Sequence, residues 1–455
     1  MKLSVFYNEK ISPIKPMHGV GQPPIYGISD QFFHYLSEAH IPYSRLHDVG
    51  GAYGNGIYVD IPNIFRNFDA DVNDPGSYDF AFTDILLANL HRYGVEPVYR
   101  LGVTIENYHY IKAYRLDPPK DFLKWAEICE HIIRHYNEGW AEGYHYGITY
   151  WEIWNEPDND RILVDPTGSS GGNQMWHGTK EQFYELYDTT AKHLKSCFGD
   201  SIRVGGYGSC GFYSIIQNPA RYGLPGAELA EPNTWQKRCM YWIDFFDGFL
   251  SYIKEHNSPI DFFSWHSYEK PEATLKFAAY LEKRLDEAGF SGLETHCNEW
   301  NPDPTVELRG SSLAAADVAA TMCAMQDTKT SLMCYYDARM GPSVYGGLFN
   351  PMTWKPLSPY YAVKAFGELY TLGTEVRLEG LEPGTYGLAA IGGDGRRALL
   401  LTNLSKEEKT LTVNVAYSHI YRVDEVHALT DEGAFTDGIT LGQYEVLLLT
   451  DYELC

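Results

Sequence analysis

The sequence lacks the common marks of a secreted, membrane-bound or metal-dependent protein. Its eight cysteines are widely spaced and form no C-x-x-C pair, so buried free thiols are favoured over a disulfide framework or a metal site. The first ten residues hold no apolar segment long enough for a signal peptide, and no later run approaches the length of a membrane span. We therefore expect a cytoplasmic protein with no membrane partner.

Positive charge is also scarce. The 455 residues include 36 Lys and Arg against 60 Asp and Glu, which gives a net charge of −24. This excess repels nucleic acid and anionic membranes, and it suits a neutral or cationic small ligand. The sequence contains no H-E-x-x-H, P-loop or G-x-S-x-G motif, so it implies neither a metal ion nor a cofactor.

Aromatic residues, in contrast, are abundant. They make up 15% of the chain, with 36 Tyr and 10 Trp. Sugar rings present apolar C–H faces that stack on such side chains, although aromatic residues serve equally well as ordinary core. The length and the hydrophobic content of 44% suit one large catalytic domain with a smaller one attached.

Strand and helix patterns alternate along the first 370 residues or so. Eight short runs rich in β-branched and aromatic residues are each followed by a segment of helical periodicity. The predicted strands are Ile14–His18, Pro42–Leu46, Val95–Leu101, Ile148–Trp154, Ile202–Gly206, Ile260–His266, Leu293–Asn298 and Ser331–Asp337. Eight regular units favour an α/β fold of the (β/α)₈ barrel type, over residues 1–371, rather than a doubly wound sheet.

A different pattern begins after about Leu372. Short apolar segments such as Arg397–Leu401 and Tyr444–Leu449 are separated by turns rich in Gly, Asp, Asn and Thr. This pattern predicts an antiparallel β-sandwich over residues 372–455. The N-terminal segment Lys2–Tyr7 can add a strand to it.

Two predicted strands end in an amide followed by a carboxylate. The fourth reads Trp-Glu-Ile-Trp-Asn-Glu-Pro over Trp151–Pro157, and the seventh ends at Asn298-Glu299. Strands four and seven face each other across a barrel mouth, so Glu156 and Glu299 can converge on one bond. Glycoside hydrolysis uses such a pair, a protonated acid and a charged carboxylate. Two close carboxylates also separate their pKa values, which is expected to keep the acid protonated near neutral pH.

These residues resemble glycoside hydrolase family 39, a family of retaining (β/α)₈-barrel glycosidases that includes β-xylosidases and α-L-iduronidases. The Trp-Asn-Glu-Pro motif resembles that of the family's strand four. Tyr43–Asp48 resembles its Arg-x-His segment, and Ser264–Tyr268 its strand-six segment. The resemblance implies Glu156 as general acid/base and Glu299 as nucleophile. It also implies retention through a covalent glycosyl-enzyme, with carboxyl groups about 5 Å apart.

The resemblance further implies a set of substrate-binding residues. Asn155 would bind the sugar 2-hydroxyl, and Arg45 and Tyr268 would orient and hold the charge on Glu299. Arg45 can instead anchor a structural ion pair, and His266 can be a satisfied core histidine. The full predicted set is Asn155, Arg45, His47, His266, Tyr268, Tyr336 and Trp354.

The function we expect is exo-acting, retaining hydrolysis of short pentose-containing oligosaccharides, similar to that of a β-xylosidase. An arabinose-releasing enzyme of the α-L-arabinosidase or arabinobiosidase type stays open. So does an α-L-iduronidase, which needs a cation for the substrate carboxylate, such as Arg339, Lys270 or Arg161. A non-catalytic carbohydrate-binding protein is less compatible, because both glutamates are present. The glycine-rich loop Asp48–Gly56 departs from the family pattern, and with Asp165–His177 it would shape the pocket.

One further motif points elsewhere. Gly206–Gly211 satisfies G-x-G-x-x-G after a predicted strand, and Glu231 lies near the distance expected for a ribose contact. However, no helix clearly opens after it, and three prolines interrupt the required unit: Pro219, Pro225 and Pro232. We therefore do not interpret this segment as a dinucleotide site.

Overall fold

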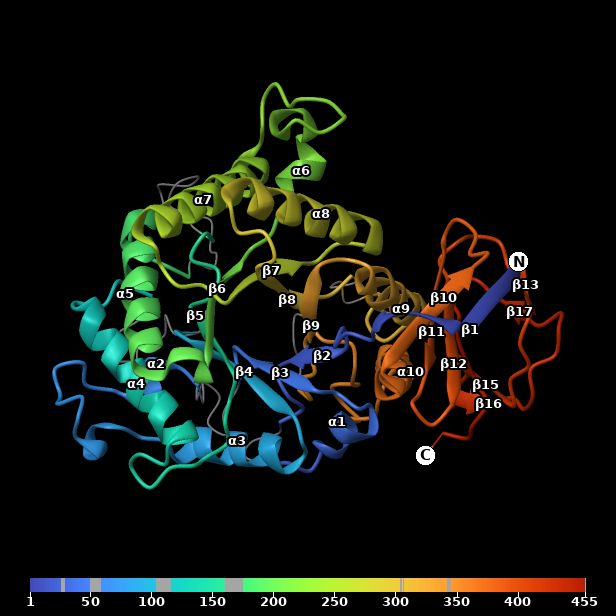
Figure 1. The fold of residues 1–455 in the computed structure, drawn as a ribbon, viewed down its shortest axis with the longest axis horizontal. Coiled ribbons are helices and arrows are strands. Elements are labelled where there is room, and N and C mark those ends of the chain that lie inside the picture. Colours follow the sequence, from blue (N-terminus) through green and yellow to red (C-terminus); the bar gives the residue numbers. More distant parts are fainter. Residues whose placement is uncertain are drawn as a thin grey trace.

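Eight parallel strands close into a barrel at the centre of the molecule (Figure 1). The computed structural model describes residues 1–25, 29–49, 59–103, 116–159, 175–302, 305, 307–341 and 345–454. In barrel order the strands are β2 (Gly19–Gly21), β3 (Tyr43–Leu46), β4 (Glu96–Leu101), β5 (Tyr150–Ile153), β6 (Arg203–Ser209), β7 (Phe262–Ser267), β8 (Glu294–Trp300) and β9 (Thr330–Tyr336). The predicted (β/α)₈ barrel is confirmed.

Helices alternate with these strands and cover the barrel (Figure 1). They are α1 (His34–Glu38), α2 (Ile61–Ile64), α3 (Ala81–Arg92), α4 (Phe122–Asn137), α5 (Lys180–Phe198), α6 (Ser214–Gln217), α7 (Thr234–His256), α8 (Pro271–Ala288), α9 (Ser312–Gln326) and α10 (Ser358–Leu372). Thr179 and Asn233 begin α5 and α7 with reciprocal capping boxes, which satisfy backbone N–H groups of the first turn. None of the helices in the described ranges combines the length and apolarity needed to cross a bilayer.

The first barrel strand lies later in the chain than the sequence predicted. The prediction placed it at Ile14–His18, but the strand is β2 (Gly19–Gly21), and the N–H of Ile14 donates to the carbonyl oxygen of Gly373 at 3.0 Å. Proline lacks the N–H that a central strand donates, and Pro13 and Pro16 both fall in this region, which explains the shift. The other seven predicted strands overlap the observed ones.

A separate, mostly antiparallel sheet contains the C-terminal strands and also the N-terminal strand (Figure 1). Its order is β14-β1-β10-β11-β12-β18-β15-β16, and β13 and β17 form a two-stranded ribbon. The bounds are β1 (Lys2–Pro13), β10 (Thr374–Glu379), β11 (Thr385–Ile391), β12 (Arg397–Asn403), β13 (Lys409–Thr410), β14 (Thr412–Val413), β15 (His419–Val423), β16 (Ala428–Asp431), β17 (Thr440–Leu441) and β18 (Val446–Thr450).

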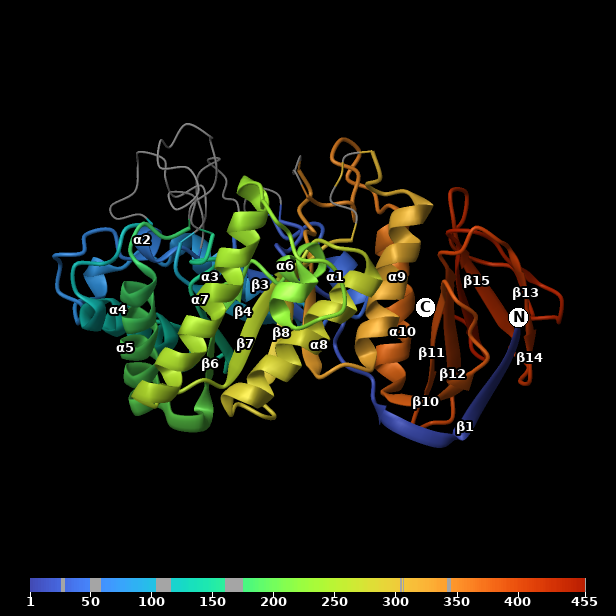
Figure 2. The same ribbon diagram turned by 90° about the horizontal axis from the view of Figure 1, so that it is seen from above.

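Both faces of this sheet are apolar. Helices α9 and α10 lie between the barrel and one face (Figure 2), where Leu400 and Leu448 join the core of the barrel. On the other face, Leu399 and Leu449 form a second core with Leu3 of β1. Neighbouring residues belong to different cores because successive side chains of a strand point to opposite sides. The N-terminal strand is therefore part of the hydrophobic packing of the C-terminal sheet.

We predict that Leu3→Ala lowers the free energy of unfolding by about 2–4 kcal/mol, because it removes a fully buried side chain from the second core. The measurement is the urea midpoint of the C-terminal sheet's unfolding transition. Lys2→Ala, one residue away and exposed, is the matched control. Equal midpoints for the two variants would contradict a packing role for β1.

Candidate functional site

The two predicted catalytic glutamates meet at the carboxyl end of the barrel. Glu156 follows β5, the fourth barrel strand, and Glu299 lies on β8, the seventh. Glu156 adopts a left-handed backbone conformation (φ 45°), and its N–H donates to the carbonyl oxygen of Gly208 at 2.9 Å. One carboxylate oxygen of each glutamate and a ring nitrogen of His266 all lie within 4.8 Å of one another. The structure thus brings together residues that are 143 positions apart in sequence.

The Glu299 carboxylate is held from two sides. Its Oε1 accepts a hydrogen bond from Arg45 Nη1 at 2.7 Å, and its Oε2 accepts one from the Tyr268 hydroxyl at 2.7 Å. Burial raises the pKa of Glu299 above its ordinary value, and the opposing effects of His266 and Arg45 reduce this rise. Arg45 and Tyr268 therefore both bind the Glu299 carboxylate, and their role toward a substrate stays a prediction.

The Glu156 carboxylate pairs with a histidine. His266 Nδ1 lies 2.7 Å from Glu156 Oε1, and Asn159 Nδ2 donates to Oε2 at 3.0 Å. Burial acts to raise the pKa of Glu156, but the hydrogen bonds from His266 and Asn159 bring it below its ordinary value. Burial likewise disfavours charged His266, yet Glu299 and Glu156 raise the pKa of this histidine.

The pKa shift of Glu156 thus has the opposite direction to the one expected from sequence. Two carboxylates alone would leave a proton on Glu156, the predicted acid. A third group, His266, lies beside both carboxylates: its Nδ1 is 2.7 Å from Glu156 Oε1 and lowers the pKa of Glu156, while the two glutamates raise the pKa of His266. The prediction considered only the carboxylates, and the position of the imidazole between them changes the sign of the shift.

Arg45 connects this pair to the interior of the barrel. Its Nε donates to Glu152 Oε2 at 2.7 Å and its Nη2 to Asn155 Oδ1 at 2.6 Å. This contact leaves Asn155 Nδ2 as the donor for a ligand. Glu152 is fully buried on β5, and it also accepts hydrogen bonds from Ser264 Oγ and Asn298 Nδ2. Sequence reasoning missed Glu152, whose one signal is a charge inside an otherwise apolar strand.

A second buried ion pair supports His47. Arg100 Nη2 lies 2.6 Å from Asp60 Oδ1, both side chains are fully buried, and Arg100 Nε donates to His47 Nδ1 at 3.2 Å. Burial and the neighbouring Arg100 lower the pKa of His47 well below its ordinary value. His47 is therefore neutral with its proton on Nε2, which lies 3.9 Å from Glu299 Oε1. Sequence reasoning missed both Arg100 and Asp60.

The remaining predicted residues have different surroundings. The Tyr336 hydroxyl donates to Asp48 Oδ2 at 2.7 Å, and its ring lies 6.4 Å from that of Tyr268. Trp354 packs edge-on against Phe32 with ring centroids 5.7 Å apart, and its place in the pocket stays a prediction.

Parts of the predicted pocket lie outside the described residues. Most of the loops Asp48–Gly56 and Asp165–His177 fall there, and so does Arg161. Of the other two cations considered for a substrate carboxylate, Lys270 binds Asp317 at 2.6 Å, and Arg339 Nη2 donates to the main-chain oxygen of Asp48 at 3.2 Å.

The G-x-G-x-x-G segment is built into this site. A Cβ on Gly208, which has a φ of +64°, would lie 3.0 Å from Arg45 Nη2, 3.1 Å from Asn155 Oδ1 and 3.3 Å from His266 Nε2. Only glycine lets the backbone of β6 pass so close. The next two residues bind the segment after Glu156, since Ser209 Oγ donates to Asp158 Oδ2 at 2.8 Å and the N–H of Cys210 lies 3.2 Å from the same oxygen.

Two groups of described residues have the ligand types of a metal site. Glu156, His266 and Glu299 form one, and Glu130, His193 and Cys197, between α4 and α5, form the other. The Arg45 guanidinium already supplies the positive charge beside Glu299 that a cation would provide. In the second group, Glu130 is bound by Arg134 and His193 at 2.7 and 2.6 Å. Existing ion pairs account for both groups.

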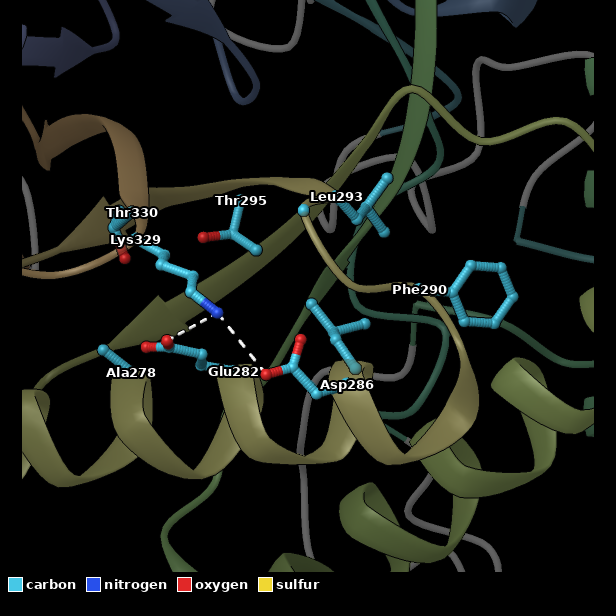
Figure 3. Close-up of a pocket in the computed structure, with 10 residues that line it drawn as sticks. Ala278, Glu282, Asp286, Phe290, Leu293, Thr295, Lys329 and Thr330 are labelled. Carbon is cyan, nitrogen blue, oxygen red and sulfur yellow. Dashed lines mark hydrogen bonds and ion pairs between the residues drawn. The ribbon is translucent and has the colours of Figure 1, made fainter.

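A hollow at the opposite end of the barrel is closed by ion pairs. Figure 3 shows Lys329 reaching from the start of β9 toward α8, where its Nζ lies 2.7 Å from Glu282 Oε1 and 3.4 Å from Asp286 Oδ2. Residues at the amino-terminal end of such a barrel usually stabilise the fold, whereas active sites lie at the carboxyl end. The candidate site is therefore the carboxyl end.

A (β/α)₈ barrel with one carboxylate on each of strands four and seven defines the class of barrel glycoside hydrolases. Within that class, the sequence model described as glycosyl hydrolases family 39 matches residues 45–331, more than half of the chain. The chain belongs to this family, as the resemblance of its motifs predicted.

Solved structures share this fold at low sequence identity. A glucosidase from Croceicoccus marinus is 20% identical with a TM-score of 0.76, over 99% of this chain and 98% of that one. A family 39 β-xylosidase from Caulobacter crescentus is 18% identical with a TM-score of 0.67, over 99% of both chains. An α-L-arabinofuranosidase from Thermotoga maritima is 14% identical with a TM-score of 0.64, also over 99% of both. These similarities establish the architecture of the barrel and sheet.

We predict that Gly208→Ala lowers kcat/KM for an aryl glycoside about 100-fold, because its Cβ displaces Arg45, Asn155 and His266. Gly223→Ala is the matched control, since Gly223 has a similar φ of +69° but no atom within 4 Å of the added Cβ. Steady-state kinetics and thermal unfolding of both variants separate crowding from backbone strain. Equal kinetic effects at the two positions would contradict the role of Gly208.

Asp158 predicts a pH-dependent stability. Burial raises the pKa of Asp158 to about 7, so the folded protein binds this proton more tightly than the unfolded chain. The ordinary pKa of an aspartate is 3.8. The stability that this bound proton contributes is therefore fully present below about pH 4 and is lost as the pH rises through 7. The asparagine of Asp158→Asn stays neutral at every pH. Relative to wild type, the free energy of unfolding should therefore rise by on the order of a few kcal/mol at pH 8 and by almost nothing at pH 4.

Urea unfolding of both proteins at the two pH values measures this gain. Asp69→Asn makes the same chemical change at a side chain that is 74% exposed, and it controls for the loss of one surface charge. A stability difference between Asp158→Asn and wild type that is the same at pH 4 and pH 8 would refute the buried proton.

Proposed function

We propose that this glycosidase is an exo-acting, retaining enzyme that cleaves pentose-containing oligosaccharides in the manner of a β-xylosidase. One observation carries the proposal of retention: a carboxylate oxygen of Glu156 and one of Glu299 lie within 4.8 Å of each other. Retaining glycosidases hold their carboxyl groups about 5 Å apart, whereas inverting enzymes leave about 6.5–9.5 Å for a water molecule.

In the first step Glu299 attacks the anomeric carbon. The bond to the leaving oxygen breaks, an ester forms between the sugar and Glu299, and Glu156 gives a proton to the leaving oxygen. Because Glu156 accepts a hydrogen bond from His266, we propose that the proton comes from His266 across this 2.7 Å contact. Arg45 and Tyr268 hold the attacking carboxylate, and Asn155 Nδ2 binds the 2-hydroxyl.

In the second step water hydrolyses the ester. Glu156 acts as base and takes a proton from the water, whose oxygen bonds to the anomeric carbon as Glu299 leaves. The two inversions give net retention. Activity requires ionised Glu299 and a proton shared by Glu156 and His266, so the rate should rise with pH as Glu299 ionises and fall as the shared proton is lost.

The aromatic lining supports a sugar substrate. The Tyr345 ring lies 4.8 Å from that of Tyr268 and 5.2 Å from that of Tyr336, so three rings form a cluster that contacts Glu299 through the Tyr268 hydroxyl. Such rings stack on the apolar faces of sugars. The family 39 β-xylosidase among the similar structures makes a β-xyloside the first substrate to test.

We predict that azide separates the roles of the two glutamates. Azide should rescue Glu299→Gly and give a glycosyl azide of inverted configuration, because it replaces the nucleophile directly. It should rescue Glu156→Ala and give a retained product, because it attacks the intact glycosyl-enzyme. The aryl glycoside is chosen beforehand from a panel of β-xyloside, α-L-arabinofuranoside, α-L-arabinopyranoside, β-glucoside and α-L-iduronide.

Product configuration is read by proton NMR before the sugar mutarotates. Asp69→Asn, which changes a carboxylate that is 74% exposed, should keep wild-type activity without azide. Undiminished hydrolysis by both glutamate variants would disprove the mechanism, and an inverted product from the wild type would disprove retention.

A further inference from the structure

The carboxylate of Asp48 lies beside the catalytic pair. One of its two oxygens accepts no hydrogen bond from the described residues. Asp48 follows His47 directly after β3, and its side chain is 10% exposed. Its Oδ2 accepts the Tyr336 hydroxyl at 2.7 Å, but its buried Oδ1 has no hydrogen-bond donor among the described residues. A buried carboxylate oxygen left without a donor costs free energy, which a ligand hydroxyl would recover.

The His47 ring lies near both this oxygen and the carboxylate of Glu299, the proposed nucleophile. His47 Nε2 is 3.2 Å from Asp48 Oδ1, without hydrogen-bond geometry, and 3.9 Å from Glu299 Oε1. Since His47 Nδ1 accepts from Arg100, the proton of His47 is on Nε2. The pocket therefore presents an N–H donor and a carboxyl oxygen acceptor side by side, next to Glu299. Adjacent hydroxyls of a sugar offer the complementary acceptor and donor.

The neighbouring cations bind other groups. Arg100 pairs with Asp60 at 2.6 Å, and Arg45 pairs with Glu152 and Glu299. Arg339 Nη2 donates to the main-chain oxygen of Asp48 at 3.2 Å, and its Nε lies 3.7 Å from Asp337 Oδ2. Among the described residues, the side-chain donor to this carboxylate is the Tyr336 hydroxyl; such a carboxylate attracts hydroxyl donors and repels a second carboxylate.

We propose that Asp48 is a sugar-binding residue that selects neutral sugars over uronic acids. Its Oδ1 accepts hydrogen bonds from ring hydroxyls on carbons three and four, while Asn155 binds the 2-hydroxyl on the side of Glu299. This inference rests on the proposed glycosidase function for the position of the sugar. It deepens that function, because it favours a neutral pentose over the uronic acid that an iduronidase would take.

The test is the binding of piperidine iminosugars to wild type and Asp48→Asn by calorimetry. The probes have the xylo configuration, one set lacks the 3- or the 4-hydroxyl, and one carries a carboxylate on carbon five. Wild type should bind the neutral probe at least tenfold more tightly than the carboxylate probe. Asp48→Asn should lower the affinity for the neutral probe about 10- to 100-fold, and it should reduce the preference of the protein for the neutral probe over the carboxylate probe.

The deoxy probes distinguish recognition from a structural role. For the probe that lacks the hydroxyl bound by Asp48, the substitution should have almost no effect, because the interaction is already absent. A general distortion of the pocket would weaken every probe equally, and that result would overturn the proposal, as would unchanged binding of all probes. Asp69→Asn controls for the change in net charge.

Binding and hydrolysis are measured separately, so the two proposals fail in different ways. A protein that binds the neutral probe through Asp48 but hydrolyses no aryl glycoside would refute the proposed chemistry and support Asp48. A hydrolase whose preference is the same with Asp48 and with Asn would refute the role of Asp48. Failure of every neutral probe to bind wild type would also refute it.

Discussion

The buried charge of Arg45 is the constraint on which the rest of the site depends. A guanidinium inside a barrel is stable only with anionic and hydrogen-bonding partners, and removal of one partner from a buried pair costs about 3–5 kcal/mol. Arg45 on β3 meets this need with Glu152 on β5 and Glu299 on β8. One side chain therefore holds together three strands and orients both the proposed nucleophile and, through Asn155, a donor for the substrate.

The conformation around Glu156 depends on the same centre. Trp154 and Glu156 have positive φ values of 72° and 45°, which are unfavourable for such residues and occur mainly where surrounding contacts impose them. Here the contacts come from β6, where Gly208 accepts the N–H of Glu156 and Ser209 binds Asp158. The strained turn directs Glu156 toward His266, which lies beside both carboxylates and lowers the pKa of each.

Several parts of this arrangement could be predicted from local sequence. Seven of the eight barrel strands were predicted, because each has its own run of β-branched and aromatic residues. The positions of Glu156 and Glu299 at strand ends were predicted as well. The first strand was misplaced because β2 is only three residues long and contains two glycines. The glycine motif of β6 was separated from nucleotide binding, but its contact with Arg45, Asn155 and His266 had no local signal.

The sequence by itself determined the alternation of strands and helices, the family motifs and the two carboxylates, since these depend on periodicity and on short stretches of chain. Only the tertiary structure decided the direction of the Glu156 pKa shift and the surroundings of Asp48. Both depend on distances of 2.7–3.9 Å between residues far apart in the chain, such as His266 beside Glu156 and Tyr336 beside Asp48. Burial and electrostatic interactions act through space, so the same carboxylate can be an acid, a base or a sugar ligand according to what the fold places beside it.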